Sequence, residues 1–456
     1  MTAIPNILPR RRNIGNQAHA CPARDIDHAH RKLSLSLWSA VAATAALRIA
    51  FAARYLAQQA HRTLHVLPFV YESGNVARAL ATGHGFASPL GMPSGPTAWV
   101  APVYPSLLAV LFHLFGVASF SAFIAAVAVN IVFATLVCFP LYFATLAMLR
   151  SGHGIRTARA AAILACWLWA LYPNAILLTY ESMWNGCLSA LLGIVLLWAT
   201  LRLRPTPQPL RNWAFYGMLW GLVLLTNPIF LAVLPVLLLC LAWPRGGISR
   251  WRHAALALAV LMACILPWTV RNYRDFHALV PVRSDLGLSL WLGNNAHSTV
   301  PWHGQQHPLD NLAERARFLR HGEIPYMHAK LAAAVRYIAS HPEQTAHRSW
   351  LRFCAFWSGG TPDPLRAFLR GGWMNRYVLI CDLLFALAAL GAIIVFLRRP
   401  RALVWALISF PLLIPCAYYL TEAIPRYRLA IDPELILLAA CSFTLLHARL
   451  HRHPRL

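Results

Sequence analysis

Long hydrophobic runs recur along most of this chain, and they constrain its fold more than any other feature. A helix needs about 20 apolar residues to cross the hydrocarbon core of a bilayer. Inside a bilayer, only helices and closed barrels satisfy every backbone hydrogen bond within the protein. The runs therefore predict an all-α polytopic membrane protein with about ten transmembrane helices. The predicted spans are 33–55, 120–149, 159–177, 182–201, 213–226, 229–243, 253–272, 377–397, 402–420 and 434–448.

The charges of the chain lie mostly in the gaps between these runs. There are 40 Lys and Arg residues against 15 Asp and Glu residues, for a formal net charge of +25. About half of the basic residues lie in the N-terminal tail and in alternate short gaps, as in the cytoplasmic loops of membrane proteins. This bias predicts that both termini are cytoplasmic and that the long loops 56–119 and 273–376 are outside. No long basic segment interleaved with aromatic residues is present, so nucleic acid is not an expected partner.

The same boundaries divide the chain into parts. We expect a cytoplasmic tail, a transmembrane region that contains the loop 56–119, an outer loop domain, a C-terminal set of spans and a second short tail. Their bounds are 1–32, 33–272, 273–376, 377–448 and 449–456. Within the outer loop domain, alternation over 277–293 predicts strands, and helical spacing after Met327 predicts helices. The domain is therefore expected to be a small α/β unit.

Carboxylates are scarce, so those beside the predicted spans are informative. Glu72 lies in VYESGNVARALATGHGF, where Ser73–Leu80 predicts a short helix that Gly83-His84-Gly85 ends. A carboxylate at the positive end of a helix stays ionised and is fit to act as a base. The alternative is an acid that only starts the helix. Glu181, at a predicted outer turn, is the second candidate. The other acids expected near one outer cavity are Asp382, Glu422, Asp432 and Glu434.

Arginine and asparagine side chains near the outer ends of the spans are candidates for binding a substrate or its phosphate. An arginine can hold a phosphate with two parallel hydrogen bonds, whereas a lysine acts as a point charge. The alternative for each arginine is an anchor that reaches the lipid head groups. Asn294 and Asn295 form a turn of their own, which is suited to a polar ligand. The remaining candidates are Arg271, Asn272, Arg426, Tyr427 and Arg428.

The stretch SGPTAWVAPVYPSLL, residues 94–108, contains three prolines just before a hydrophobic run. Each proline removes an amide donor and restricts the residue before it, so the stretch cannot be one continuous helix. Irregular backbone beside a bilayer needs protein or a water-filled cavity around it. We expect a wall between the first loop and the next span. Trp99 and Tyr104 are expected at head-group level, either stacked on a ligand or anchoring the loop.

Cysteine and histidine spacing predicts neither a disulfide framework nor a metal site. Most of the ten cysteines lie in or beside hydrophobic runs, and none forms a CxxC pair. His297, His303 and His307 match no standard spacing of metal ligands, so solvated loop histidines are expected. We predict no cofactor.

Three parts of the chain resemble the integral-membrane glycosyltransferases of the GT-C fold. The similarity is to the bacterial branch near the lipid A aminoarabinose transferases and the protein O-mannosyltransferases. The motifs are VYESGNVARALATGHGFASP with SGPTAWVAPVYPSLLAVLFHLFG, PWTVRNYRDFHALVPVRSDLGLSLWLGNN, and PRYRLAIDPELILLAA. The resemblance covers about residues 33–448.

The resemblance implies an enzyme of the bacterial inner membrane, in contact with membrane lipids. It would move a sugar from a polyprenyl-phosphate carrier to a lipid, polysaccharide or protein acceptor on the outer face. The first-loop acid of the family, which acts as or near the base, falls on Glu72 and makes 56–119 the catalytic loop. The family's Asp-Glu pair falls one helical turn earlier, on Phe69 and Val70, so a divalent metal has no support.

The candidate residues divide between two roles in such a reaction. Glu72 would deprotonate an acceptor hydroxyl, and Arg271, Arg426 and Arg428 would stabilise the departing phosphate. Two other functions stay open. A transporter or flippase of lipid-linked sugars should show inverted repeats and broken helices at the midplane, and no repeat is evident. A non-catalytic membrane protein of envelope assembly is the third possibility.

Overall fold

The computed structural model describes residues 23–60, 69–204, 208–242, 247–301, 304–398 and 402–450. Within these residues the chain is largely helical, and its one pairing of extended backbone is an isolated bridge between Ala87 and Pro96. The predicted N-terminal tail lies outside the described residues up to residue 22, and the C-terminal tail lies outside them from residue 451.

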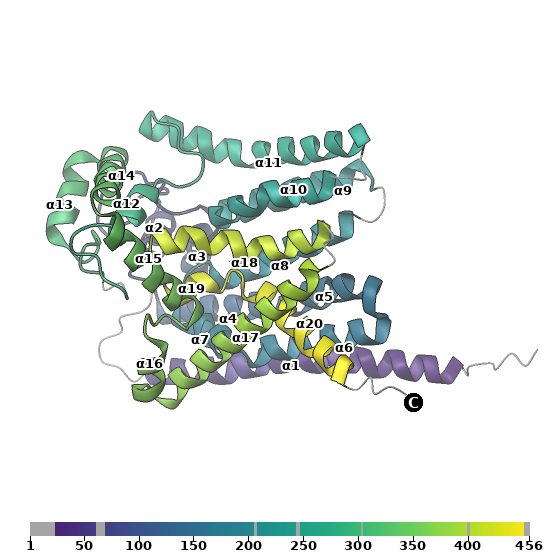
Figure 1. Ribbon diagram of the computed structural model, residues 1–456. Helices are drawn as coiled ribbons and strands as arrows, with labels where there is room; N and C mark the ends of the chain where they lie inside the picture. Colours follow the sequence, from purple (N-terminus) through teal and green to yellow (C-terminus); the bar gives the residue numbers. More distant parts are fainter. Residues whose placement is uncertain are drawn as a thin grey trace, which may run out of the picture.

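All ten predicted spans fall on helices, and these helices pack into one bundle (Figure 1). Two of the spans, 120–149 and 159–177, each consist of two consecutive helices. The bundle helices are α1 (Ala23–Ala60), α4 (Phe120–Leu136), α5 (Cys138–His153), α6 (Ile155–Leu171), α7 (Pro173–Glu181), α8 (Gly186–Leu203), α9 (Leu210–Thr226), η1 (Pro228–Val233), α10 (Leu234–Ala242), α11 (Gly247–Phe276), α17 (Trp373–Leu397), α18 (Ala402–Leu420) and α20 (Asp432–Leu450).

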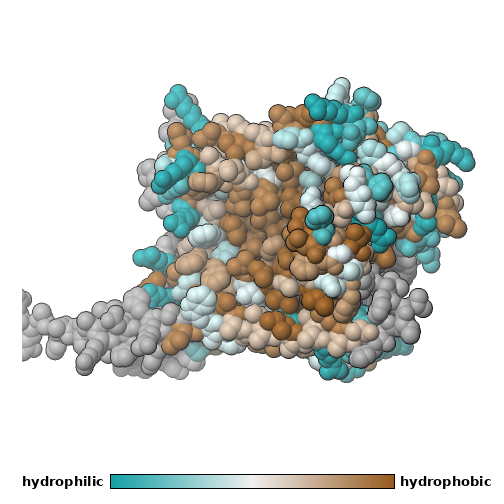
Figure 2. All heavy atoms as spheres, turned by 180° about the vertical axis from the view of Figure 1, so that it is seen from behind, coloured by the Kyte–Doolittle hydropathy of each residue, from teal (hydrophilic) through white to brown (hydrophobic). Residues whose placement is uncertain are grey.

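Within the described residues, six helical segments are long and apolar enough to cross a membrane, and a seventh qualifies if α6 and α7 form one broken span. These two helices meet at a 47° bend, where Pro173 cannot continue the hydrogen bonding of α6. The other predicted spans are shorter, as in α9 and α10, or begin with acids, as in α20. Figure 2 shows apolar residues across the middle of one face and polar residues toward its ends. The chain is therefore a multi-pass membrane protein.

The remaining helices lie toward one end of the bundle, on the left of Figure 1. The two ends of the described chain, at residues 23 and 450, lie toward the opposite end. The helices outside the predicted spans are α2 (Glu72–Ala81), α3 (Val103–Phe115), α12 (Leu286–Gly293), α13 (Leu312–His321), α14 (Glu323–Ser340), α15 (Pro342–Trp357), α16 (Pro364–Arg370) and α19 (Pro425–Arg428).

The prediction of strands in 277–293 is wrong, because the described part of the loop domain contains helices and no strand. Residues 286–293 form α12 instead. A short apolar run does not reveal its own period, since a buried helix and a buried strand are both apolar on every side. Packing selects the helix here. At Gly287, a Cβ atom would lie 2.1 Å from the carbonyl oxygen of Met327 in α14.

Helix starts and ends that depend on nearby residues are predicted correctly. The structure confirms the helix over Ser73–Leu80 as α2, and Gly83 and Gly85 beyond it have φ angles of 81° and 73°. In the loop domain, α15 begins at Pro342 and ends before Gly359, whose φ is 69°. Proline at a helix start and glycine past its end are signals carried by the local chain alone.

The first part of the proline-rich stretch is irregular, as predicted, and α3 begins in its second part. Glu323, at the start of α14, holds the irregular backbone. Its carboxylate accepts hydrogen bonds from the Thr97 hydroxyl, from the Ala98 amide at 2.8 Å and from the Ser284 hydroxyl at 2.7 Å. One buried carboxylate therefore ties the two long loops together.

Candidate functional site

Glu72 is the first residue of α2 and is only 6% exposed. Tyr71 before it has extended backbone, with φ −93° and ψ 172°, and its side chain does not cap the helix. The carboxylate therefore lies at the positive end of α2 with no competing cap. Gly74 allows the close packing of this helix start, because a Cβ atom there would lie 2.2 Å from the carbonyl oxygen of Phe69.

His307, from the loop before α13, contacts Glu72 directly. Its Nε2 lies 3.0 Å from Oε1 of Glu72, and its Nδ1 accepts a hydrogen bond from the Leu309 amide at 3.2 Å. Because Nδ1 accepts, the proton directed at Glu72 is carried by Nε2. The imidazole also packs against Trp99, with ring centroids 5.5 Å apart. His307 is 8% exposed, so the prediction of a solvated histidine is wrong for this residue.

The pKa values of two carboxyls at this site are shifted in opposite directions. Burial alone would raise the pKa of Glu72, but the contact with His307, a backbone hydrogen bond and the charge of Arg426 together outweigh burial and lower it. For Glu422, which follows α18, burial outweighs the nearby positive charges and raises the pKa to about 7. At neutral pH, Glu72 is therefore ionised and Glu422 is partly protonated. Environments that separate the pKa values of neighbouring acids give them different roles in catalysis.

Arg426, in α19, brings a positive charge to the two carboxyls. Its guanidinium carbon lies 4.2 Å from the centre of the Trp184 ring and 5.3 Å from that of Tyr427. Among the described residues, no carboxylate oxygen lies within 4 Å of this guanidinium. An arginine supported by aromatic faces keeps hydrogen-bond donors available for an anionic ligand.

Aromatic side chains from several elements surround these charged groups. Tyr71 lies beside Trp184, with centroids 5.9 Å apart, and Tyr427 stacks on Tyr418 at 4.5 Å. Trp99 is almost fully buried beneath His307, so in this structure it supports the imidazole rather than a lipid head group. Rigid rings of this kind hold the charged side chains in place.

Arg428 lies two residues beyond Arg426 but belongs to a separate, sealed cluster. Its guanidinium lies 3.0 Å from Asp432 and 3.3 Å from Asp382, and it donates to the Trp357 carbonyl at 3.2 Å. None of the three charged side chains is more than 1% exposed. The donors of Arg428 are thus used inside the protein, which does not suit the predicted binding of phosphate.

The predicted acids are divided between these places. Glu422 joins Glu72, whereas Asp382 and Asp432 lie in the sealed cluster. Glu181, the second candidate for a catalytic acid, ends α7 and is exposed. The expectation that these acids lie near one outer cavity is therefore wrong for Asp382 and Asp432.

Arg271 and Asn272, toward the end of α11, hold loop backbone. Two nitrogens of the Arg271 guanidinium donate to the carbonyls of Thr97 and Phe86, at 2.6 and 2.7 Å. Its third nitrogen pairs with Asp275 at 2.8 Å. Asn272 is fully buried and donates to a loop carbonyl at 2.9 Å. In this structure, the two side chains position the first loop.

Asn294 and Asn295 close the end of α12. The Asn294 amide donates to the Leu420 carbonyl at 2.7 Å, and the Asn295 amide donates to a carbonyl within α12 at 2.8 Å. Tyr104 is buried in α3, with its hydroxyl 3.4 Å from the side-chain oxygen of Asn130. These three side chains contact neighbouring elements of the fold.

Sequence reasoning misses His307 and Trp184. The partners that place them in the site, Glu72 for His307 and Arg426 for Trp184, are far away in the sequence, so only the packing of distant segments reveals their role. His297, from the same loop as His307, is exposed as predicted, and His303 lies outside the described residues. Glu422 is detectable in the sequence as one of the few acids beside a span, although its pairing is not.

No family model matches the chain, and no curated protein matches its sequence. Solved structures are similar in fold. The oligosaccharyltransferase of Archaeoglobus fulgidus, in complex with Zn and sulfate, aligns with a TM-score of 0.53 at 14% identity, over 91% of this chain and 49% of its own. The same organism's AglB, in complex with an inhibitory peptide and a dolichol-phosphate, aligns with a TM-score of 0.55 at 13% identity, over 91% and 51%. This chain has the GT-C fold.

The chain spans about half the length of the oligosaccharyltransferase structures. ArnT from Cupriavidus metallidurans, bound to undecaprenyl phosphate, aligns more loosely. Its TM-score is 0.37 at 15% identity, over 88% of this chain and 78% of ArnT.

The described residues around Glu72 do not supply a set of metal ligands. Among the described residues, no group of three or more His, Cys, Asp or Glu side chains could hold a metal ion. At the positions where the resemblance places an Asp-Glu pair, Phe69 packs against Phe112 and Phe123, and Val70 is exposed. Apolar side chains there supply no metal ligand.

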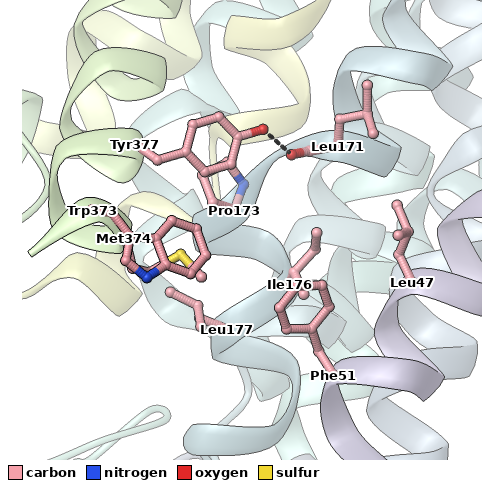
Figure 3. Close-up of a pocket in the computed structure, with 9 residues that line it drawn as sticks. All are labelled: Leu47, Phe51, Leu171, Pro173, Ile176, Leu177, Trp373, Met374 and Tyr377. Carbon is pink, nitrogen blue, oxygen red and sulfur yellow. Dashed lines mark hydrogen bonds between the residues drawn. The ribbon is translucent and has the colours of Figure 1, made fainter.

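An apolar groove lies in the GT-C bundle between α1, α7 and α17 (Figure 3). Its volume is about 170 Å³. The Tyr377 hydroxyl donates at 3.2 Å to the Leu171 carbonyl, beside the bend at Pro173. The lining has no charged side chain, so the groove offers apolar contacts only. The lining residues are Leu47, Phe51, Leu171, Pro173, Ile176, Leu177, Trp373, Met374 and Tyr377.

Proposed function

We propose that this protein is a membrane glycosyltransferase that uses a polyprenyl-phosphate-linked sugar as donor. The GT-C fold supports the proposal, and AglB, which shares the fold, has been solved with a dolichol-phosphate and an inhibitory peptide. The observation that carries it is the placement of Arg426 on Trp184, which lies beside Tyr71, so that the charge of the arginine acts on the neighbouring Glu72. An ionised, buried carboxylate lies near an arginine that no carboxylate within 4 Å neutralises, among the described residues.

The proposed reaction uses these two residues in different ways. Glu72 accepts the proton of the acceptor hydroxyl, and the acceptor oxygen forms a bond to the anomeric carbon of the sugar. The bond from that carbon to the phosphate oxygen breaks, and its electron pair leaves with the polyprenyl phosphate. Negative charge grows on the phosphate as the diester becomes a monoester. Arg426, with Tyr427 beside it, would stabilise this charge because it is held in place before the reaction.

We infer that the site faces the outer side of a bacterial inner membrane. The arginine-rich gaps support cytoplasmic termini. The loop 56–119 would then be the catalytic loop, and 273–376 the periplasmic loop domain that covers it. A reporter enzyme that works only outside the cytoplasm should be active when fused at residue 320. A reporter that works only in the cytoplasm should be inactive there, and its activity would contradict this orientation.

Replacement of Glu72 tests the proposed chemistry. Mass spectrometry of glycolipids from cells with and without the protein would first identify the donor and the product. Glu72→Gln should then lower the rate about 10²–10⁴-fold, because the amide keeps the size of the side chain but cannot accept the proton. The matched control is Glu343→Gln, at an exposed acid near the start of α15, which should keep its activity.

Full activity of Glu72→Gln would show that Glu72 is not the base, and Glu181 would be the next acid to test. An unchanged glycolipid profile in cells that lack the protein would instead favour a transporter or an assembly protein. The acceptor, whether lipid, polysaccharide or protein, would follow from the product that disappears.

A further inference from the structure

We propose that His307 is a positioning residue for Glu72. Its Nε2–H group holds one oxygen of the carboxylate and leaves the other oxygen to act as the base. The inference rests on the proposed function of Glu72 and adds a residue of the loop domain to that reaction.

The imidazole is held at both nitrogens, which is the first support for this role. Nε2 donates to Glu72 at 3.0 Å, and Nδ1 accepts from the Leu309 amide at 3.2 Å. The backbone on either side is also held, since the His307 amide donates to Gly304 at 2.8 Å and the His307 carbonyl accepts from Asn311 at 2.8 Å. A rotation of the ring would break both side-chain hydrogen bonds. The donor therefore has a fixed position and a fixed tautomer.

The surroundings of Glu72 explain why a donor is needed. A carboxylate that is 6% exposed loses most of its hydration, and burial disfavours the ionised form. The charged groups that face it are mixed. Arg426 of α19 is positive, whereas Glu422 after α18 and Asp285 before α12 are acids whose negative charge would oppose ionisation. The contact with His307 offsets burial at short range and lowers the pKa of Glu72.

A purely structural tether makes a different prediction from a positioning residue. Asparagine places its amide near the position of Nδ1, and glutamine places its amide near the position of Nε2. Both substitutions fill part of the space and keep a polar group in the loop. Only His307→Gln puts an N–H group within reach of Glu72. If His307 acts on this carboxylate, the Gln and Asn variants should therefore differ. If His307 only tethers the loop, the two variants should behave alike.

The protonation of Glu72 can be measured without an assay for the transferase. Dicyclohexylcarbodiimide reacts with protonated carboxyls: the acid O–H adds across a C=N bond, and the adduct rearranges to an N-acylurea with no leaving group. Mass spectrometry of the peptide that contains Glu72, from full-length purified protein labelled over a range of pH, gives the pH at half-maximal rate. The exposed Glu181 serves as an internal reference, and the peptide from Glu72→Gln gives the background.

We expect His307→Ala and His307→Asn to raise the midpoint at Glu72 by about 1 pH unit or more, because burial is no longer offset. His307→Gln should stay closer to wild type, and His297→Ala, at an exposed histidine of the same loop, should not differ from it. In the transferase assay, the acidic limb of the kcat/KM profile should move in the same direction.

Equal midpoints in all variants would overturn the proposal, and equal shifts in His307→Gln and His307→Asn would reduce His307 to a tether. A different result would reject the proposed function and leave the role of His307 intact. If the midpoints shift as expected while Glu72→Gln keeps full activity, the pair exists but Glu72 is not the base.

Discussion

Arg426 and Arg428 lie two residues apart on α19, yet they belong to clusters of different kinds. Arg428 contacts two carboxylates in a site closed to solvent. Arg426 rests on the rings of Trp184 and Tyr427 and is only partly buried. Residues two apart on a helix point to different sides, so a single turn serves both clusters.

The difference teaches how to tell a structural arginine from one that can bind a ligand. A buried guanidinium that is surrounded by acids has its charge and its donors in use. A guanidinium that lies on aromatic faces is fixed in position, but its charge is not neutralised. The first arrangement holds α17, α19 and α20 together, and the second presents a cation beside Glu72.

The largest expected effect is on folding, at the sealed cluster. Arg428→Ala leaves Asp382 and Asp432 buried without their counter-ion, which should destabilise the fold by about 3–5 kcal/mol. Thermal unfolding of the protein in detergent and its yield from membranes measure this loss. Arg426→Ala is the matched control and should unfold near the wild-type temperature. Equal stability of the two variants would remove the distinction between the clusters.

The next effect is on donor use, at the open cluster. Arg426→Lys keeps the charge but loses the planar arrangement of donors, so kcat/KM for the donor should fall about 10–100-fold with the fold intact. Arg428→Lys should show the reverse pattern, with a lower unfolding temperature and, in the folded fraction, activity near wild type. Wild-type kinetics in Arg426→Lys would assign Arg426 to anchoring.

The pH dependence of stability should differ between the two acids of the open cluster. Burial raises the pKa of Glu422 from about 4.5 to about 7, so the folded protein binds more protons than the unfolded chain between these values. Stability contributed by Glu422 is therefore lost as the pH rises through this window. Glu422→Gln should abolish that loss when unfolding temperatures at pH 5 and pH 8 are compared.

Glu72→Gln provides the matched variant with the opposite sign. His307 lowers the pKa of Glu72 despite burial, so the stability it contributes is present above the ordinary pKa and is lost as the pH falls through the lowered value. Glu72→Gln should remove this loss of stability at acidic pH. It should leave in place the loss of stability between pH 5 and pH 8 that comes from Glu422. The same slope in both variants would contradict the split between the two carboxyls.

The smallest expected effect concerns the ring that supports Arg426. Trp184→Leu removes a cation–π contact worth about 0.5–1 kcal/mol, so donor use should fall about 2–5-fold. Trp184→Phe keeps an aromatic face and should retain most of the activity. Kinetics of both variants with the identified donor measure the effect, and an unchanged rate in Trp184→Leu would show that the ring does not position Arg426.

The sequence predicts helices well where their signals are local. The glycines after α2 and the proline that starts α15 act through their own backbone, so no distant contact is needed. The same reasoning fails for α12, whose apolar run fits a strand as well as a helix until α14 packs against it. Periodicity in so short a run carries too little information.

The sequence predicts single residues of the candidate site but not the contacts between them. Glu72 and Arg426 are detectable as scarce or basic residues beside spans. Their pairing with other residues is not detectable, since His307 and Glu422 are brought to Glu72 only by the packing of distant segments. Sequence reasoning gives Arg426 and Arg428 the same role, and only the structure shows that Arg428 is the one paired with Asp382 and Asp432.

The hydrogen bond between Thr97 and Glu323 joins residues 226 positions apart. A ribosome that adds about 5–20 residues per second delivers Glu323 roughly 10–45 s after Thr97. During that interval, the backbone around Thr97 has no carboxylate to hold it. Glu72 has no histidine beside it either, because His307 is made at nearly the same late time. The synthesis of the first spans and the completion of the site are therefore separate in time. The nascent chain has no assembled site until most of it has been made.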